Sequence, residues 1–354
     1  MTIVFVGDLA LPSGISPQVE DGFPSFDEPV VANLEGPIAS RAPKEGRVSG
    51  LWSSAAEILP FLRTCGIVAV SLANNHIQDF GDAPRLTKIQ LQSAGIASFG
   101  AGATVEEAIA PEVVEVGDQR FALLGFGWEV IGCRSARGKR PGVSPLRPQH
   151  VLSSVSTTLK GNPDTYVVAI MHWNYEGEAF PQPMHRQLAF AAIDAGASAV
   201  IGCHPHCVQG VEVYRGCPIV YSLGNWFLPS GVFWGGTLVY PAATRLELAF
   251  EWDPRTGGMR CHWYEYDSFR HTLEFLGVES LDQSTAMEYL TPFRGMNHKE
   301  YCRWFSINRR KKIALPVYEN KDHNFENWIK DRWVRGRQQG IGLLRGLGLK
   351  QGPR

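Results

Sequence analysis

Five short clusters of polar residues follow apolar segments of the chain, and they contain residue types that bind divalent metal ions. The clusters begin at Asp8, Asn33, Asn74, His172 and Gly202. Buried parallel strands read as continuous apolar runs, and open α/β sheets bind ligands beyond the carboxyl ends of their strands. The sequence therefore predicts that the clusters meet at one edge of a sheet.

Within these clusters, the side chains that could hold a metal offer both oxygen and nitrogen atoms. The candidate ligands are Asp8, Glu35, Asn75, His172, His204 and His206. Mixed donors favour manganese, zinc or iron over magnesium or calcium, which prefer oxygen alone. On an extended segment His204 and His206 would project to the same side, and Pro205 would stiffen their spacing. One or two divalent metal ions are therefore expected.

Each cluster has a purely structural alternative when it is taken alone. An aspartate after a first strand is usually a cap or turn residue, and Asn74-Asn75 is typical of a turn. His172 alone would more often be a hydrogen-bonded, partly buried residue. Their joint occurrence at strand ends favours a functional site. The histidines outside the clusters are predicted to be structural or exposed: His150, His185, His262, His271, His298 and His323.

Apolar periodicity predicts alternating strands and helices over the first 230 residues, which is typical of an α/β protein. Strands are expected at residues 3–6, 30–32, 68–72, 96–99, 113–116, 121–126, 166–171, 199–201, 211–214, 219–222, 246–250 and 260–266. Helices are expected at residues 54–65, 82–94, 148–159, 184–195 and 324–334, and a capping box at residues 104–107 indicates the start of a further short helix.

Composition predicts a soluble globular protein and argues against several partner classes. The chain has 354 residues, 44% hydrophobic and 19% charged, with a formal net charge of −1. Such a balance gives no overall field that would recruit nucleic acid or a membrane. Seven scattered cysteines indicate free thiols in a reducing compartment, so a cytoplasmic location is predicted. Neither a signal peptide nor a transmembrane segment is predicted.

The character of the sequence changes after about residue 280. A basic run covers residues 309–312, and residues 332–354 contain six Arg or Lys and no acidic residue. We predict a domain over residues 1–280, followed by a helical extension over residues 281–354 with a basic, mobile tail. The tail would be a solvated terminus or would make a weak contact with an anionic surface.

The ordered motifs resemble those of a known family. They are Gly7-Asp8, Asn33-Leu34-Glu35, Asn74-Asn75-His76, His172-Trp173, His204-Pro205-His206 and Ser222-Leu223-Gly224-Asn225. Over about residues 1–270 the chain resembles the capsule-synthesis CapA family, which is associated with poly-γ-glutamate capsules and belongs to the calcineurin-like metallophosphatase superfamily. The resemblance implies a four-layer α-β-β-α sandwich of two mixed sheets.

The resemblance also implies roles for individual residues. Glu35 would bridge two metals, the first also held by Asp8 and His206, and the second also held by Asn75, His172 and His204. His76 would donate a proton or a hydrogen bond to the leaving group. Asn33, Asn74, Glu176, Gln209 and Asn225 would contact the substrate or support the ligands. The first metal position lacks one ligand, because Ala10 stands where classical phosphoesterases have histidine.

Two functions are consistent with these residues. The first is a metal-dependent hydrolase acting on an anionic small molecule or polymer, with a phosphoester as the default substrate and a γ-glutamyl amide as an alternative. The second is a non-catalytic accessory that holds an anionic polymer or a partner synthase. A plain nucleotide-binding fold is disfavoured, because no glycine-rich phosphate loop follows any predicted strand.

Overall fold

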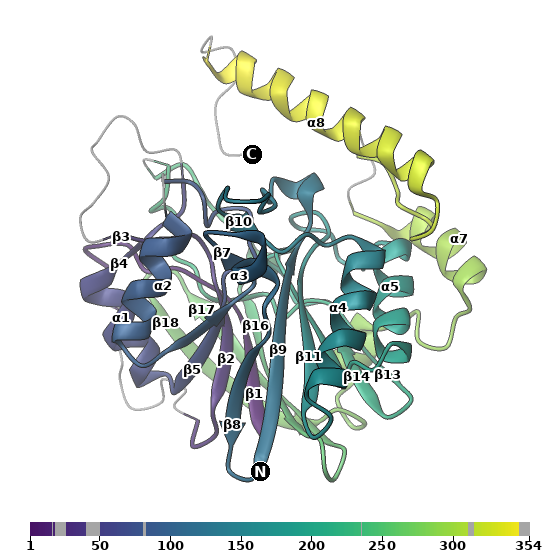
Figure 1. Cartoon of the computed structure of the whole chain (residues 1–354), viewed down its shortest axis with the longest axis horizontal. Coiled ribbons are helices and arrows are strands. Elements are labelled where there is room, and N and C mark those ends of the chain that lie inside the picture. The colour runs from purple at the N-terminus through teal and green to yellow at the C-terminus, as the bar shows by residue number, and fades with distance from the viewer. Residues whose placement is uncertain are drawn as a thin grey trace.

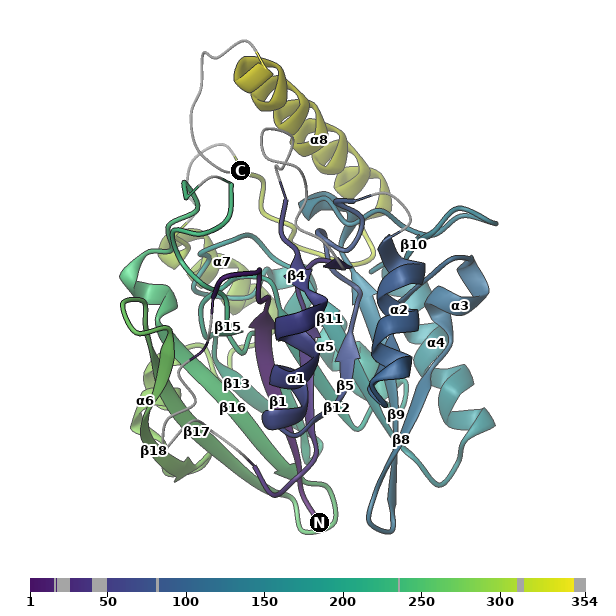
Figure 2. The ribbon, with the colours of Figure 1, turned by 90° about the vertical axis from the view of Figure 1, so that its left-hand side faces the viewer.

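The computed structural model describes residues 1–15, 17, 26–39, 50–80, 83–234, 236–310 and 315–346. Two β-sheets face each other, and helices cover the outer face of each sheet (Figure 1, Figure 2). The predicted α/β class and the predicted four layers are confirmed.

The first sheet is eight-stranded and mixed, with β1 (Ile3–Leu9) near its centre. One side of β1 carries parallel strands: β2 (Val30–Leu34), β5 (Ile67–Ser71) and β6 (Ala97–Phe99). The other side carries antiparallel strands: β16 (Leu246–Asp253), β17 (Gly258–Asp267) and β18 (Thr272–Ser280). The short β15 (Asn225–Phe227) runs parallel to the end of β1.

The second sheet has six strands in the order β13-β14-β12-β11-β9-β8. Its four central strands are parallel: β9 (Gln119–Gly127), β11 (Tyr166–His172), β12 (Ala199–Cys203) and β14 (Cys217–Val220). Its antiparallel edges are β8 (Glu112–Val116) and β13 (Val211–Tyr214). Two small ladders pair β3 (Ile38–Ala39) with β4 (Ser53–Ser54), and β7 (Ala101–Gly102) with β10 (Gly142–Val143).

Alternation along the strands explains how the sheets are covered. In β1, Ile3 and Phe5 belong to the core between the two sheets, whereas Val4 and Val6 belong to the core beneath the helices. Successive side chains of a strand point to opposite faces, so a continuous apolar run supplies both cores. The main covering helices are α1 (Ala55–Thr64), α2 (Ala83–Ser93), α4 (Pro148–Gly161) and α5 (Pro183–Asp194). Shorter helices are α3 (Val105–Ile109), η1 (Glu129–Ile131) and η2 (Ala242–Thr244).

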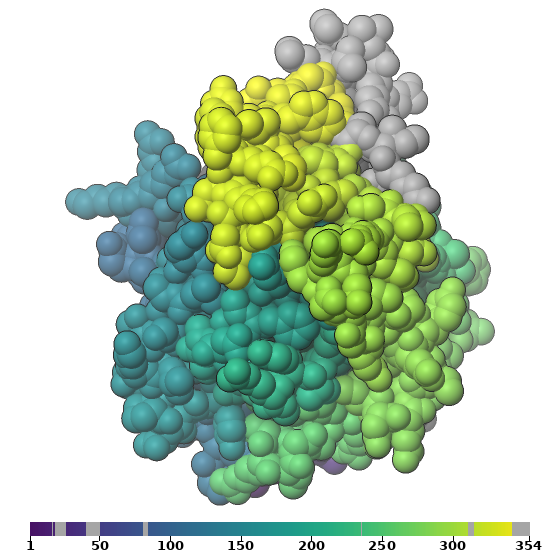
Figure 3. Space-filling model, turned by 90° about the vertical axis from the view of Figure 1, so that its right-hand side faces the viewer, coloured from purple at the N-terminus to yellow at the C-terminus, as the bar shows by residue number. Residues whose placement is uncertain are grey.

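The C-terminal part forms three helices, α6 (Thr285–Leu290), α7 (His298–Asn308) and α8 (Asn324–Gly346). Helix α7 packs against α5, where Tyr301 and Phe305 are fully buried. The C-terminal segments cover part of the side seen in Figure 3. The predicted helix at 324–334 was too short. The end of the basic run, residues 311–312, and the end of the predicted tail, residues 347–354, lie outside the described residues.

Strand β18 was not predicted, because its residues do not alternate between apolar and polar types. Phe275 and Leu276 are adjacent, apolar and exposed, and Gly277, with φ 151°, follows them. The boundary at residue 280 coincides with the end of β18, and a separate extension remains a prediction. In the described part of the chain, no helix is both long and apolar enough to cross a bilayer.

Candidate metal centre

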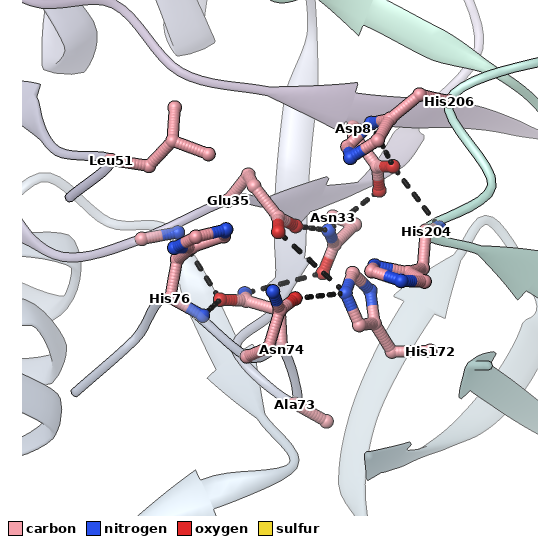
Figure 4. Close-up of polar contacts among 12 residues, drawn as sticks. Asp8, Asn33, Glu35, Leu51, Ala73, Asn74, His76, His172, His204 and His206 are labelled. Carbon is pink, nitrogen blue, oxygen red and sulfur yellow. Dashed lines mark hydrogen bonds and ion pairs between the residues drawn. The ribbon is translucent and has the colours of Figure 1, made fainter. Parts of the chain in front are cut away.

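The polar clusters meet where the carboxyl ends of the parallel strands of both sheets converge. In the first sheet, Asp8 of β1 stands opposite Asn33 of β2 and Asn225 of β15. In the second sheet, His172 ends β11 and lies beside Cys203, the last residue of β12. The backbone N–H of His204, which follows, donates to Asp8 Oδ2 at 3.0 Å. This hydrogen bond is one of those that join the two sheets at the site (Figure 4).

Two asparagines hold neighbouring groups of the cluster in place. Asn33 Nδ2 donates to Asp8 Oδ1 at 2.7 Å and to Glu35 Oε2 at 2.6 Å. Asn74 Nδ2 donates to the carbonyl of Leu34 at 2.7 Å, and its Oδ1 accepts from the His76 backbone N–H at 3.2 Å. Both asparagines therefore orient other cluster residues, as the partners of metal ligands do.

Glu35, His172 and His204 form the part of the cluster best suited to a cation. Their candidate ligand atoms all lie within 4.8 Å of one another, and the three side chains are buried. Within the described residues, Glu35 Oε1, His172 Nδ1 and His204 Nδ1 have no hydrogen-bond partner. Glu35 Oε1 lies 3.6 Å from His172 Nε2, so Nε2 is the His172 nitrogen that faces this candidate ligand. Buried polar atoms without partners are rare because they are costly, so Glu35 Oε1 and His204 Nδ1 suit the ligands of an ion.

Burial shifts the same three groups toward their uncharged forms. Burial lowers the pKa of His172 to about 3 and holds the pKa of His204 well below its usual range. Burial and the charge of Asp8 raise the pKa of Glu35 well above its usual range. Neutral imidazole is the form that binds a metal. Asn75 Oδ1 lies 2.8 Å from His172 Nε2 and adds an oxygen to this group.

Asp8 and His206 instead satisfy each other. His206 Nδ1 lies 3.3 Å from Asp8 Oδ2 and 2.9 Å from Asn225 Oδ1. Burial acts to lower the pKa of His206, but the hydrogen bond and charge of Asp8 raise it to about 9. Burial acts to raise the pKa of Asp8, but His206 keeps it below its usual value. The two groups therefore form an ion pair at neutral pH.

The segment that carries His204 and His206 is not extended, so the predicted reason for their convergence was wrong. Their φ angles are 96° and 57°, in the left-handed region that side chains other than glycine seldom adopt. The ring centroids lie 5.6 Å apart. The carbonyl of Pro205, between them, accepts from the Gly177 backbone N–H at 2.8 Å. Such strain persists only where surrounding contacts enforce it, and it is common at functional sites.

His76 has a partner that was not found in the sequence. Asp79 Oδ2 accepts from His76 Nδ1 at 2.7 Å and from the Leu51 backbone N–H at 3.1 Å. The ring of half-buried Trp234 meets the His76 ring edge to face, with centroids 5.6 Å apart. The three-residue spacing from His76 to Asp79 was the available signal for this pair, but an aspartate after a turn has many structural uses.

Two predicted site residues lie at the margin of the cluster. Gln209 is buried and its Nε2 donates to the Glu178 carbonyl at 2.7 Å, so it supports the loop after His172. Glu176 is half-buried, and its charge is one of the influences that raise the pKa of His206. The structure gives neither residue a direct contact with Glu35, His172 or His204.

A small pocket adjoins the cluster. Its volume is about 90 Å³, and its lining includes Asn225, Tyr240, Thr244 and Arg245. The Tyr240 ring lies 5.3 Å from the ring of His206, centroid to centroid. A much larger cleft, about 1020 Å³, lies between α5, β13 and the segment before α7.

The larger cleft is a weaker candidate than the polar cluster. Its buried charge, Arg186, is already bound by both carboxylate oxygens of Glu212 at 2.7 Å. The polar cluster is therefore the better candidate for a functional site, although the cleft has the larger volume.

Comparison with known proteins finds similarity to capsule synthesis proteins. Residues 2–229 match the family described as bacterial capsule synthesis protein PGA_cap. The chain is 32% identical over 183 residues to the capsule biosynthesis protein CapA of Bacillus anthracis, covering 51% of this chain and 44% of that protein. It is 30% identical over 246 residues to the PGA biosynthesis protein CapA of Bacillus subtilis (strain 168), covering 64% and 63%.

A further relative carries a different name. A probable polyglutamine synthesis accessory protein of Mycobacterium tuberculosis is 32% identical over 203 residues, covering 54% of this chain and 53% of that protein. The chain thus matches less than two thirds of the length of each of these relatives. Among solved structures, a 5′-nucleotidase precursor from Thermus thermophilus matches 79% of this chain and 53% of its own, at 14% identity and a TM-score of 0.38.

Proposed function

Because the chain belongs to the bacterial capsule synthesis protein family PGA_cap, we propose that it is a metal-dependent hydrolase linked to capsule or poly-γ-glutamate biosynthesis. The observation that carries this proposal is the buried group of Glu35, His172 and His204, whose candidate ligand atoms all lie within 4.8 Å of one another. The proposed location is the cytoplasm.

The residues fit a divalent cation. Glu35, Asn75, His172 and His204 would hold it, and Asp8 with His206 would hold a second, weaker one. Carboxylate, amide and imidazole ligands together suit manganese, zinc or iron. When bound, the ion supplies Lewis-acid chemistry, drawing electron density from a phosphoryl or carbonyl oxygen. Asn33, Asn74 and Asn225 are proposed to orient these ligands, since Asn33 bonds to Asp8 and Glu35, and Asn225 to His206.

His76 is the proposed proton donor. The Asp79 carboxylate accepts from Nδ1, so the ring is fixed and Nε2 is the nitrogen that faces a substrate. Hydrolysis places the hydroxyl of water on the phosphorus or carbonyl carbon and breaks the bond to the leaving group. The proton that the leaving group needs would come from His76 Nε2. Asp79 acts through His76 and is a positioning residue.

The proposed substrate is anionic. Exposed Arg245 lines the pocket beside Asn225, and its guanidinium could bind a phosphate or a γ-glutamyl carboxylate. A phosphoester is the first choice, because the proposed proton donor and cation suit an oxygen leaving group. A γ-glutamyl amide would use the same groups.

Separate variants of the ligand and the proton donor test the proposal. His204→Ala should lose both the ion and turnover of an aryl phosphate diester. His76→Ala should keep the ion and lose roughly 100-fold or more in turnover. His323→Ala, an exposed histidine in the segment before α8, is the matched control and should change neither quantity. Full turnover in both site variants would overturn the proposal.

A non-catalytic accessory function is the second candidate, and two observations favour it. The relative from M. tuberculosis is named as an accessory protein, and Asp8 is already paired with His206. An accessory protein should bind poly-γ-glutamate without cleaving it. Wild-type protein that holds its ion but hydrolyses neither an aryl phosphate nor poly-γ-glutamate would decide for this function.

A further inference from the structure

The last helix, α8, turns its apolar side chains outward. Phe325, Trp328, Ile329 and Trp333 are exposed to 75, 52, 48 and 49%. With Arg332 they occupy positions i, i+3, i+4, i+7 and i+8, which form one face of a helix. We call these five residues the outer stripe. A surface helix normally turns such a stripe toward the core, so the orientation needs a reason.

Contacts on the opposite face fix this orientation. Val334 is buried, and Asp331 Oδ1 accepts from the Tyr318 hydroxyl at 2.8 Å. Gln338 Nε2 donates to the Val130 carbonyl at 3.1 Å, and Asn327 Nδ2 donates to the Asn320 carbonyl at 2.8 Å. The inward face of α8 is therefore largely polar and bound to the body of the protein. The outer stripe is held in solvent by these contacts.

Helix α8 also carries a net positive charge. Helix α8 contains the basic residues Lys330, Arg332, Arg335, Arg337 and Arg345, and the acidic residues Glu326 and Asp331. Five positive and two negative charges give a net charge of +3. The acidic groups are engaged, because Glu326 binds Lys330 and Asp331 binds Tyr318. The Arg332 guanidinium lies 5.1 Å above the Trp328 ring, so cationic and aromatic groups share one surface.

We propose that α8 docks on an anionic phospholipid surface. Tryptophan, phenylalanine and isoleucine beside arginine are the side chains of helices that lie in the plane of a membrane interface. A second copy would bring two helices of charge +3 together. An acidic polymer would match the arginines but offers little apolar surface for the aromatic rings. A lipid surface offers anionic headgroups to the arginines and an apolar interior to the aromatic rings.

Docking would also orient the candidate metal centre. Helix α8 contacts η1, which follows β9 and therefore lies at the carboxyl end of the parallel strands. Figure 1 and Figure 2 both place α8 at the opposite end of the molecule from the N-terminus. A lipid surface on the outer stripe would therefore lie at the same end as the polar cluster. The proposal does not depend on hydrolysis.

Flotation of the full chain with vesicles tests this proposal. Wild-type protein should float with vesicles of phosphatidylcholine and phosphatidylglycerol, and poorly with phosphatidylcholine alone. W328S/W333S should weaken flotation at least about tenfold. R332Q/R335Q/R337Q should reduce it to the level seen with neutral lipid. F269S is the matched control, since Phe269 is 92% exposed in the turn between β17 and β18, and it should float like wild type.

Several results would overturn the proposal. One is wild-type protein that stays with the soluble fraction at every lipid composition. Another is W328S/W333S that floats like wild type while its thermal melting is unchanged. A dimer in sedimentation that W328S/W333S abolishes, without flotation, would identify a second copy as the partner. Binding to poly-γ-glutamate that needs the arginines but not the tryptophans would identify the polymer.

Discussion

The candidate centre has two halves that contain similar residue types in different states. The cation half consists of Glu35, Asn75, His172 and His204, and the paired half of Asp8, His206 and Asn225. In the cation half, burial shifts the carboxylate and the imidazoles toward their neutral forms, and Glu35 Oε1 and His204 Nδ1 have no hydrogen-bond partner among the described residues. In the paired half, Asp8 and His206 neutralise each other.

The difference shows that residue type alone does not make a metal site. A buried carboxylate can be neutralised by an ion or by a neighbouring imidazolium. Asp8 has such a neighbour in His206, whereas His172 and His204 beside Glu35 are held neutral. We therefore expect the first cation to bind in the cation half.

Removing one histidine from each half gives the largest expected contrast. His204→Ala should lower the affinity for Mn²⁺ or Zn²⁺ at least about 100-fold, because it removes a ligand from the cation half. His206→Ala should lower it less than about tenfold. Titration calorimetry of metal-free protein measures both, with His323→Ala as the control. Equal losses in the two variants would erase the distinction between the halves.

Asp79 lies outside both halves, so a variant at this position tests proton transfer without changing the cation ligands. Asp79→Asn should reduce kcat by roughly tenfold to 100-fold while KM and cation affinity stay unchanged, because only the His76 ring loses its support. The kcat–pH profile should shift as well, which a purely structural role would not produce. Unchanged kcat would remove Asp79 from the account.

A histidine at position 10 tests whether the paired half can gain the metal ligand that it lacks. Ala10 is fully buried and packs with Leu51, Trp52, Leu228 and Phe233, so an imidazole has little room there. Ala10→His should therefore leave the metal content near one ion per chain and lower the free energy of unfolding by about 1–3 kcal/mol. Elemental analysis and urea denaturation measure the two effects. A content near two ions would contradict this reasoning.

His185 lies in the core behind the site. A variant at this position tests how acid affects the stability of the fold, separately from its effect on the metal centre. His185 lies between Trp128 and Trp173, and burial lowers its pKa to about 3. In the unfolded chain the pKa of His185 would be about 6.5. Between these values the unfolded state binds more protons, so stability falls as the pH falls below about 6.5.

The expected magnitude follows from the pKa difference. At about pH 5 this histidine should cost roughly 2 kcal/mol of the free energy of unfolding, relative to neutral pH. His185→Phe should lack that component, so its stability relative to wild type should improve by roughly this amount on acidification. Urea denaturation at the two pH values measures it. A constant difference between the two proteins would show that His185 does not titrate in this range.

The smallest expected effect concerns substrate binding beside the paired half. Arg245→Gln should raise KM for an anionic substrate up to about fivefold, because an exposed ion pair contributes about 1 kcal/mol or less. The metal content and kcat should stay unchanged. Steady-state kinetics with an anionic and a neutral substrate measure the effect, which should be absent for the neutral one. An equal change for both would assign Arg245 a structural role.

The sequence located the polar clusters because their residue types follow local, strongly apolar strands such as 3–6 and 166–171. It could not locate contacts that only the tertiary fold makes, such as the hydrogen bond from the His204 backbone N–H to Asp8. It also missed Asp79 as the partner of His76, because an aspartate after a turn has many structural uses. The left-handed bends at His204 and His206 were missed because propensity favours an extended conformation there. The length of α8 was missed because Gly336 and Gly340 disfavour a helix in isolation.

Anomalous scattering from crystals with less than one equivalent of Mn²⁺ tests the central claim most directly. A single peak between Glu35, His172 and His204 is the predicted result, with Asp8 and His206 still in contact with each other. A first peak beside Asp8 and His206, or an ion bound elsewhere while the three ligand atoms stay free, would contradict the account.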